Sequence, residues 1–272
     1  MPQTFIDLWE GDLCFQHKLD VAPPLDYMST HTHNCYELLY IIDGNITHVV
    51  EDKKYKLNSG DLVFVRPNMY HFIQIDSSSK DYERINIQFD ESDINTDMSI
   101  IPPSINVINT ANNSRLSDIF AKINVYSETF DKEVFFKILR GLITEIVYNI
   151  SLTESADMRE ELSVTNPLMT KAIAYINNNL FTIKNVSEIA DAVFVTESYL
   201  FKLFKKELRK GPKKYITDKR LLAAQRMIKN GEKPTTVFEK CGFNDYTSFY
   251  RGYVECFGHS PSQEAINDTK NP

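Results

Sequence analysis

Three histidines and one glutamate near the start of the chain have the residue types and the spacing of a metal site. His31 and His33 stand two residues apart, Glu37 follows them, and His71 lies in a later segment. Residues two apart on a β-strand share a face, so His31 and His33 are expected to point the same way. Imidazole and carboxylate groups are ligands that first-row transition metals accept. The pattern therefore predicts a site in which Glu37 and His71 join the two histidines.

Side chains in the last third of the chain could contact a nucleic acid. Leu200, Leu203 and Phe204 recur at helical spacing, which predicts an amphipathic helix with one buried face. Thr196 can cap this helix, because its hydroxyl accepts a hydrogen bond from a backbone N–H that lacks a helical partner. The opposite face is basic and polar and suits a major groove between phosphates. It comprises Ser198, Phe201, Lys202, Lys205 and Lys206.

Two similar groups of short helices would position these side chains. Residues 186–192 and 196–206 form one predicted helix-turn-helix unit, and residues 234–241 and 246–257 form a second. A longer predicted helix, residues 212–229, connects them. In the second unit Gly242 ends one helix, because glycine tolerates positive φ, and Asn244 or Asp245 caps the next. Arg251 then faces outward.

Ordered blocks in this stretch resemble the DNA-binding domain of the AraC/XylS family of transcription regulators. The resemblance implies that each unit places its second helix in one of two successive major-groove segments on one face of the DNA. It also implies base-facing roles for Ser198, Phe201 and Lys202 in the first unit and for Tyr246, Thr247, Tyr250 and Arg251 in the second. The blocks are Ile189-Ala190, Leu200 to Lys205, Gly211-Pro212, Tyr215-Ile216, Arg220-Leu221, Cys241-Gly242-Phe243, Phe249 and Phe257 to Pro261.

The second unit departs from the family pattern in three places. Phe238 stands where the family has a small residue, and Val254-Glu255 stands near a position that is usually basic. Gly252 lies inside the second recognition helix, where glycine costs about 1 kcal/mol relative to alanine. We therefore expect the second unit to bind DNA weakly or to depend on a partner subunit. The alternative interpretation is a helical bundle whose basic faces are only solvated.

The N-terminal part has the alternating pattern and the turn residues of an all-β domain. Six or seven short strands with tight turns predict a small barrel or jelly roll. A further short strand is predicted at residues 105–108. The main strands are predicted at residues 13–18, 37–43, 45–50, 53–57, 61–65, 71–75 and 82–89.

The spacing from His31 to Gly44 resembles the first motif of the cupin fold, His-x-His-x3-Glu-x6-Gly. The segment from Pro67 to His71 is similar to the shortened second motif of sensor domains attached to AraC-type DNA-binding domains. In such sensors the histidines often remain as polar residues without a metal, so no metal and no cofactor are expected. The resemblance implies a pocket for a small polar effector, either a sugar or an organic acid held by Arg66. Its expected lining is His31, His33, Tyr36, Glu37, Arg66, His71 and Tyr82, and hydrogen bonding at the barrel mouth is the alternative for each.

Two apolar helical stripes follow the β segment. One runs from Leu116 to Tyr126 and the other from Phe135 to Ile150. Such helices either cover the β domain as a lid or pair between subunits. Because helices in this position commonly pair in family members with this layout, we expect a homodimer.

Charge divides the chain into two parts. Residues 165–272 contain 17 Lys and Arg against 11 Asp and Glu, a net charge of +6, whereas residues 1–164 contain 13 against 26, a net charge of −13. The sum is the overall −7. The asymmetry assigns phosphate contacts to the C-terminal half. With no apolar run of membrane length and no signal-peptide pattern, a cytoplasmic protein is expected. Four scattered cysteines argue against a disulfide framework, and Cys241 and Cys256 are expected to be buried.

The combined interpretation is an α+β multidomain protein. Residues 1–110 form a cupin-like β-barrel that senses a ligand, residues 111–152 form the helical region, residues 153–165 a linker, and residues 166–266 an all-α domain with two helix-turn-helix units. The expected function is sequence-specific regulation of transcription, more as an activator that contacts RNA polymerase than as a repressor, and not catalysis. The rivals are a metal-dependent cupin enzyme with a helical appendage and a regulator controlled by a protein partner. The first depends on His31, His33, Glu37 and His71.

Overall fold

The computed structural model describes residues 2–24, 30–75, 81–162 and 166–267. The chain divides into two compact units. The first comprises residues 1–31 and 35–163, and the second comprises residues 32–34 and 164–272.

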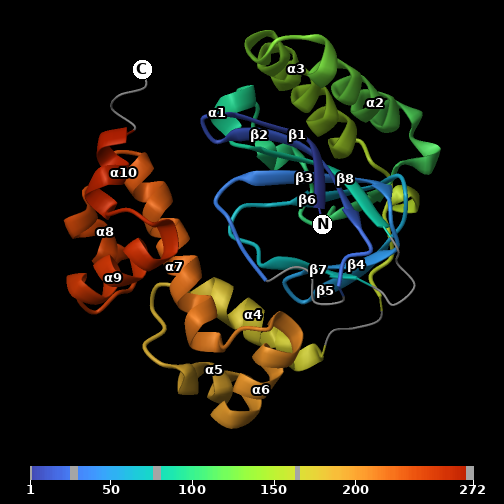
Figure 1. Cartoon of the computed structure of the whole chain (residues 1–272). Helices are drawn as coiled ribbons and strands as arrows, with labels where there is room; N and C mark the ends of the chain where they lie inside the picture. Colours follow the sequence, from blue (N-terminus) through green and yellow to red (C-terminus); the bar gives the residue numbers. More distant parts are fainter. Residues whose placement is uncertain (1, 25–29, 76–80, 163–165, 268–272) are drawn as a thin grey trace. The chain divides into compact units, whose positions relative to one another are not determined.

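The first unit is built on two antiparallel sheets that face one another (Figure 1). A six-stranded sheet has the order β1-β2-β8-β3-β6-β9, and a three-stranded sheet has the order β5-β4-β7. This arrangement confirms the predicted cupin-like β domain and corresponds to a jelly roll. The strands are β1 (Pro2–Glu10), β2 (Leu13–Val21), β3 (Tyr36–Asp43), β4 (Ile46–Val50), β5 (Lys53–Leu57), β6 (Asp61–Val65), β7 (His71–Ile75), β8 (Asp81–Phe89) and β9 (Val107–Asn109).

Side chains of the large sheet alternate between two cores. On β3, Leu39 and Ile41 are buried between the two sheets, whereas Leu38 is buried on the opposite face. The same alternation on β8 places Ile85 and Ile87 on the outer face. Because successive side chains of a strand point to opposite faces, the register of each strand decides which polar residues enter the space between the sheets.

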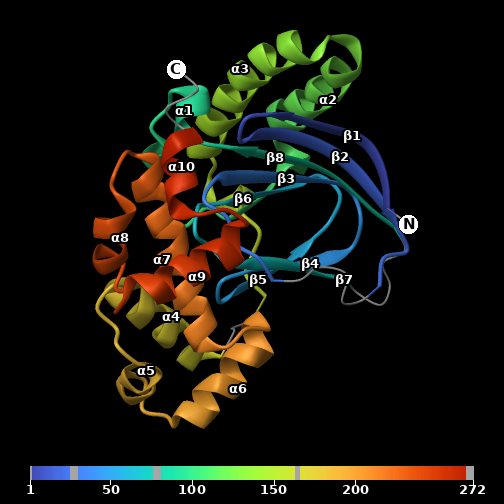
Figure 2. The same ribbon diagram turned by 60° about the vertical axis from the view of Figure 1, so that its left-hand side comes forward.

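Two long helices cover the outer face of the large sheet (Figures 1 and 2). They are α2 (Ser114–Thr129) and α3 (Lys132–Ser151). The apolar stripes expected on them are buried within this chain, and their residues belong to the same core as Leu38 and Ile87. Shorter elements complete the unit, namely α1 (Glu91–Ile94), η1 (Met98–Ile100), η2 (Thr110–Asn112) and η3 (Ser155–Asp157).

Residues 153–162, the described part of the predicted linker, are attached to the first unit by hydrogen bonds. Arg159 donates from Nε to both carboxylate oxygens of Asp61, at 2.9 and 3.0 Å. The backbone N–H groups of Arg159 and Leu162 donate to the carbonyls of Val107 and Lys54. These bonds satisfy backbone and carboxylate groups that a free linker would leave to water. The expected linker end, residues 163–165, lies outside the described residues.

The second unit is all α-helical, as predicted. Thr196 accepts a hydrogen bond at Oγ1 from the backbone N–H of Tyr199 at 3.2 Å, and Asp245 caps α9 through the N–H of Ser248 at 2.7 Å. Cys241 is buried, as expected, but Cys256 is exposed, contrary to expectation; it lies in the last turn of α9, beyond the buried Phe249 and Tyr253. The helices are α4 (Pro167–Asn179), α5 (Val186–Ala192), α6 (Glu197–Leu208), α7 (Pro212–Lys229), α8 (Pro234–Lys240), α9 (Tyr246–Phe257) and α10 (Pro261–Asn267). Among the described residues, every helix is too short or too polar to cross a membrane.

Candidate functional site

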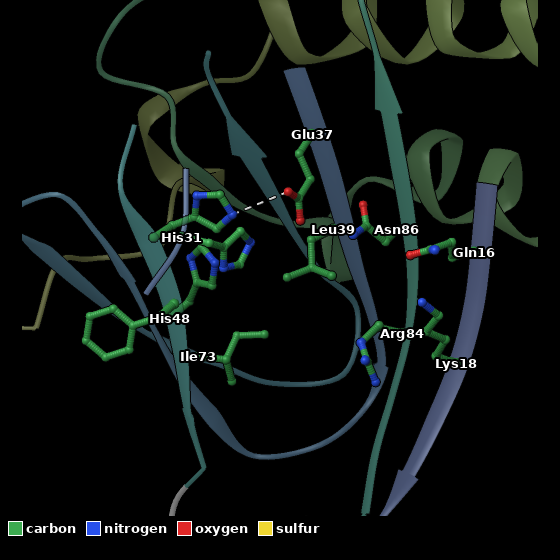
Figure 3. A pocket seen from close by; sticks show the side chains of 11 residues that line it. Gln16, Lys18, His31, Glu37, Leu39, His48, Ile73, Arg84 and Asn86 are labelled. Atoms are coloured by element: carbon green, nitrogen blue, oxygen red, sulfur yellow. Dashed lines mark ion pairs between the residues drawn. The ribbon is translucent and has the colours of Figure 1, made fainter. Parts of the chain in front are cut away.

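A cavity of about 100 Å³ lies between the two sheets of the first unit (Figure 3). Strands of both sheets supply its walls. The lining residues are Gln16 and Lys18 of β2, His31 before β3, Glu37 and Leu39 of β3, His48 of β4, His71, Phe72 and Ile73 of β7, and Arg84 and Asn86 of β8.

Imidazoles and one carboxylate gather at one end of the cavity (Figure 3). The His71 Nε2 atom lies 3.4 Å from the Glu37 carboxylate, and both side chains are buried. The His31 and His71 rings meet edge to face with centroids 4.2 Å apart. His31 is held there by a two-way backbone bridge to His71 rather than by a regular strand, with N···O distances of 3.1 and 3.0 Å.

The structure brings His31, His33, Glu37 and His71 together. Their possible ligand atoms all lie within 4.8 Å of one another. The nitrogen and carboxylate donors are those that Zn²⁺ and related ions accept, and in a closed tetrahedral site with bonds of about 2.0–2.1 Å the ligand atoms lie about 3.4 Å apart. The donor chemistry therefore fits a metal, whereas the spacing is wider than in a closed site. His33 is half-buried, and both His31 and His33 precede β3, so the face-sharing argument for a strand does not apply to them.

His48 was missed by the sequence analysis. Its imidazole is buried, and burial lowers its pKa to about 3, with the nearby His71 as a second cause. His48 is therefore neutral at neutral pH, and its Nδ1 has no hydrogen-bond partner among the described residues. The sequence of β4 could have predicted this burial, because residues two apart on a strand share a face and His48 therefore lies on the same face as Ile46 and Val50.

Lys18 and Arg84 supply positive charge to the wall formed by β2 and β8, where they are register partners. The Arg84 guanidinium forms a buried ion pair with Asp20, and its Cζ lies 4.4 Å from the centroid of the Tyr82 ring. Neither cation was predicted, because the pairing of β2 with β8 joins segments that are far apart in the sequence. Asn86 lies between the histidine cluster at one end of the cavity and the two cations on the β2–β8 wall (Figure 3). Its Oδ1 is buried without a hydrogen-bond partner among the described residues.

Four of the residues expected to line the pocket do not line it. His33 lies close to the other histidines but outside the cavity wall, and the remaining three lie elsewhere in the first unit. Tyr36 projects to the outer face, where its ring stacks on Phe64 and its hydroxyl donates to Glu91 at 3.0 Å. Arg66 donates to backbone carbonyls in residues 101–105, including that of Pro102 at 2.7 Å. Its guanidinium thus ties the chain after η1 to β6. Tyr82 is buried in the core between the sheets, beside the cavity.

The exposed face of α6 carries the side chains expected to meet DNA. Ser198, Lys202, Lys205 and Lys206 are exposed. Phe201 is half-exposed, but one edge of its ring packs on Gly211, where a Cβ atom would lie only 2.9 Å from Cε2. Phe201 therefore has a packing role that is compatible with its predicted contact to a base.

The exposed face of α9 is less basic. Thr247, Tyr250 and Arg251 are exposed, whereas Tyr246 is half-buried. The Tyr246 ring meets that of Phe238 edge to face with centroids 5.6 Å apart, so the large residue at 238 occupies the underside of this helix.

Comparisons with known proteins divide the chain in the same way as the structure. The family model of an AraC-like ligand binding domain matches residues 19–123, and the model of a helix-turn-helix domain matches residues 189–265. The first match contains most of the residues that line the cavity, and the second contains both helix-turn-helix units except for the first three residues of α5.

The curated relatives are bacterial regulators of transcription. An uncharacterized HTH-type transcriptional regulator of Bacillus subtilis, YobQ, is 35% identical over 33% of this chain and 38% of its own length. The lactose operon transcription activator of Staphylococcus xylosus is 28% identical over 44% of this chain and 43% of its own. The HTH-type transcriptional activator RhaR of an Enterobacter species is 23% identical over 88% of each chain. The match thus spans less than half the length of the first two relatives.

Proposed function

Since the chain belongs to the AraC family of transcription regulators, with a ligand-binding domain and a helix-turn-helix domain, we propose that it binds specific DNA sequences under the control of a small polar effector. The observation that carries this proposal is the position of the two family matches on the two compact units. Two of the relatives are activators of transcription by name, which supports the role of an activator and not of an enzyme. We further propose that the protein acts in the bacterial cytoplasm and contacts RNA polymerase.

DNA binding is tested on the two recognition helices. The alanine variants of Lys202 and Arg251 should each weaken binding to a selected duplex by about 1–3 kcal/mol if these side chains reach base edges. Lys205→Ala should weaken binding to all duplexes alike and flatten the salt dependence, because a phosphate contact releases counterions. Fluorescence anisotropy at several salt concentrations measures both effects.

Lys122→Ala on α2 removes the same charge from an exposed position of the ligand-binding unit and serves as the control. Unchanged affinity of both Lys202→Ala and Arg251→Ala for the selected duplex would show that α6 and α9 do not read the bases.

The size of the cavity restricts the proposed effector. A cavity of about 150 Å³ accommodates benzene, and one water molecule occupies about 30 Å³ in the liquid, so a 100 Å³ space favours a molecule of fewer non-hydrogen atoms than a hexose. Lys18 and Arg84 at one wall support a small carboxylate, and His48 and Asn86 offer hydrogen-bonding atoms to it. We therefore favour a small organic acid over a sugar.

Screening small carboxylates and sugars by thermal unfolding tests the effector. At a concentration of 100 times its Kd, a true effector stabilises the chain by about 2.7 kcal/mol. Asn86→Leu should abolish this gain, because it removes a polar atom from the cavity wall and adds bulk there. Asn124→Leu is the matched control, because Asn124 also has a buried Oδ1 without a partner among the described residues but lies on α2, away from the cavity. A gain that persists in Asn86→Leu would assign the effector to another site.

The effector can change DNA binding only if it binds two arrangements of the domains or subunits with different affinity. We propose that the helical region pairs between subunits and transmits this preference. Although the inner stripes of α2 and α3 are buried within the chain, Val134 and Tyr148 of α3 and its C-cap residue Leu152 are exposed apolar side chains. Sedimentation of Tyr148→Glu against the wild type tests this pairing, and the variant is expected to shift from dimer to monomer. A wild-type monomer at all concentrations would rule the pairing out.

A further inference from the structure

We propose that Arg220, together with Gly242, holds the two helix-turn-helix units at one separation and angle, and thereby sets the spacing between the two DNA segments that they contact. This inference rests on the proposed binding of DNA by both units. It assigns a positioning role to a side chain of α7, the helix that lies between the two units in the sequence.

Arg220 joins the loop that precedes the first helix-turn-helix unit to the turn of the second helix-turn-helix unit. Its Nε donates to the carbonyl of Leu180 at 2.8 Å, and its Nη2 donates to the carbonyl of Ile183 at 2.6 Å. Both carbonyls belong to the loop that leads into α5. Its Nη1 donates to the carbonyl of Gly242 at 2.8 Å, in the turn between α8 and α9. One planar guanidinium therefore bridges the loop before α5, which begins the first helix-turn-helix unit, and the turn between α8 and α9 of the second.

The positions of these carbonyls explain why a cation is suited to the junction. Leu180 is the C-cap of α4, and Gly242 directly follows Cys241, the C-cap of α8. The last carbonyls of a helix lack helical partners, and the C-terminus carries a partial negative charge. Arg220 thus lies between two helix C-termini. Burial lowers its pKa, but arginine stays protonated in proteins.

At Gly242 the turn of the second helix-turn-helix unit comes into close contact with the backbone of the loop before α5. A Cβ atom there would lie 2.3 Å from the carbonyl oxygen of Phe181 and 3.0 Å from Cζ of Arg220. The φ angle of Gly242 is +75°, a region that side chains other than hydrogen rarely permit. No residue larger than glycine fits at position 242 without moving the loop of residues 180–183 away from the second helix-turn-helix unit.

Both helix-turn-helix units pack on α7, on either side of Arg220. Towards its N-terminus, Tyr215 meets Phe204 of α6 edge to face with centroids 5.5 Å apart. Towards its C-terminus, Leu221 and Ala224 are buried in one cluster with Phe249 of α9. Apolar packing of this kind tolerates small rotations, whereas three directed hydrogen bonds from one rigid group do not. Arg220 is therefore the group that restricts the angle between α6 and α9.

The number of base pairs that the protein accepts between its two DNA segments measures how strictly Arg220 restricts the angle between α6 and α9. One inserted base pair moves the second segment by about 3.4 Å along the axis and by roughly one-tenth of a turn around it. A rigid protein should tolerate one spacing, and a protein with a loosened junction should tolerate several. Weaker binding alone would indicate only damage, whereas a changed spacing preference indicates the positioning role.

The test begins with a duplex selected from a random pool by the full wild-type chain. Affinity is then measured for this duplex and for a version with one base pair inserted between the two protected segments. The wild type should bind the inserted duplex about tenfold more weakly or worse, because the second helix loses base contacts. Arg220→Ala should bind the selected duplex more weakly, and its preference over the inserted duplex should fall to about threefold or less, because it loses charge-assisted hydrogen bonds. Arg220→Lys should show the same loss of preference, since lysine keeps the charge but not the planar fork.

Matched controls separate the junction from general damage. Arg226→Ala removes the same charge from an exposed position of α7 and should keep the wild-type preference. Gly242→Ala should also change the preferred spacing, whereas Gly231→Ala, at a positive φ with open space around it, should not. If Arg220→Ala does not fold, Arg220→Lys and Gly242→Ala decide the question by the same ratio. A folded variant of Arg220 with the wild-type spacing preference would overturn the positioning role, and a wild-type chain that enriches no duplex would overturn the DNA binding itself.

Discussion

Asp20→Ala is expected to destabilise the first unit by about 3–5 kcal/mol, because it leaves the buried Arg84 guanidinium without its carboxylate. Asp20 is 2% exposed and Arg84 is 5% exposed, so the ion pair is removed from bulk water. The fluorescence of Trp9, the single tryptophan, reports unfolding of this unit, since it lies on β1. Urea unfolding followed at Trp9 should show a lower midpoint with little change in slope.

The double variant Asp20→Leu with Arg84→Leu provides the control. Replacing both members of a buried ion pair by apolar residues is often neutral or stabilising, so most of the lost stability should return. The double variant should nevertheless fail to respond to a carboxylate effector, because Arg84 lines the cavity. If Asp20→Ala unfolds at the wild-type midpoint, Arg84 must find another partner or reach water in the folded chain, and the ion pair is not important for stability.

The local architecture was predictable because it depends on residues that are close in the sequence. The turn signals around Gly60 and the alternation on either side of it define strands β5 and β6 with the bounds that the structure shows. The caps Thr196 and Asp245 likewise mark the starts of α6 and α9. The strand missed was β1, although the two-residue turn Gly11-Asp12, with Gly11 at a φ of +61°, joins it to β2 and is a local hairpin signal.

The composition of the cavity was only partly predictable, because it depends on pairing between distant segments. The imidazole end follows from a local motif, His31 to Glu37, and the structure places both residues at the cavity. The basic end depends on the register of β2 against β8, which aligns Lys18 with Arg84. A shift of one residue would turn Arg84 to the outer face, where the helices pack. Alternation alone cannot fix that register, so Arg66, a neighbour of the motif strands, was predicted to hold the effector in place of Arg84.

His48 should make the first unit sensitive to mild acid. Its pKa is about 3 in the folded chain, where burial disfavours the charged ring, and about 6.5 in an unfolded chain. Below pH 6.5 the unfolded state therefore binds a proton that the folded state does not, so stability falls as the pH falls from 6.5 toward 3. The expected loss is about 1.4 kcal/mol per pH unit once the pH is well below 6.5, which amounts to roughly 2.3 kcal/mol between pH 6.5 and 4.5 and about 2.7 kcal/mol between pH 7.5 and 4.5.

His48→Leu removes this titration and isolates its contribution. The leucine fills a similar space beside Ile46 and Val50 and removes a buried polar atom, so the variant should be at least as stable as the wild type at pH 7.5. As the pH falls to 4.5, the wild type should lose about 2.7 kcal/mol more than the variant, measured by urea unfolding at Trp9. The ionisable groups around the ring, His31, His71 and Glu37, remain in both proteins, so their own titrations largely cancel in the difference. Parallel curves for the two proteins would mean that the His48 ring accepts its proton in the folded chain, which requires either water or a rearranged Glu37 carboxylate beside it.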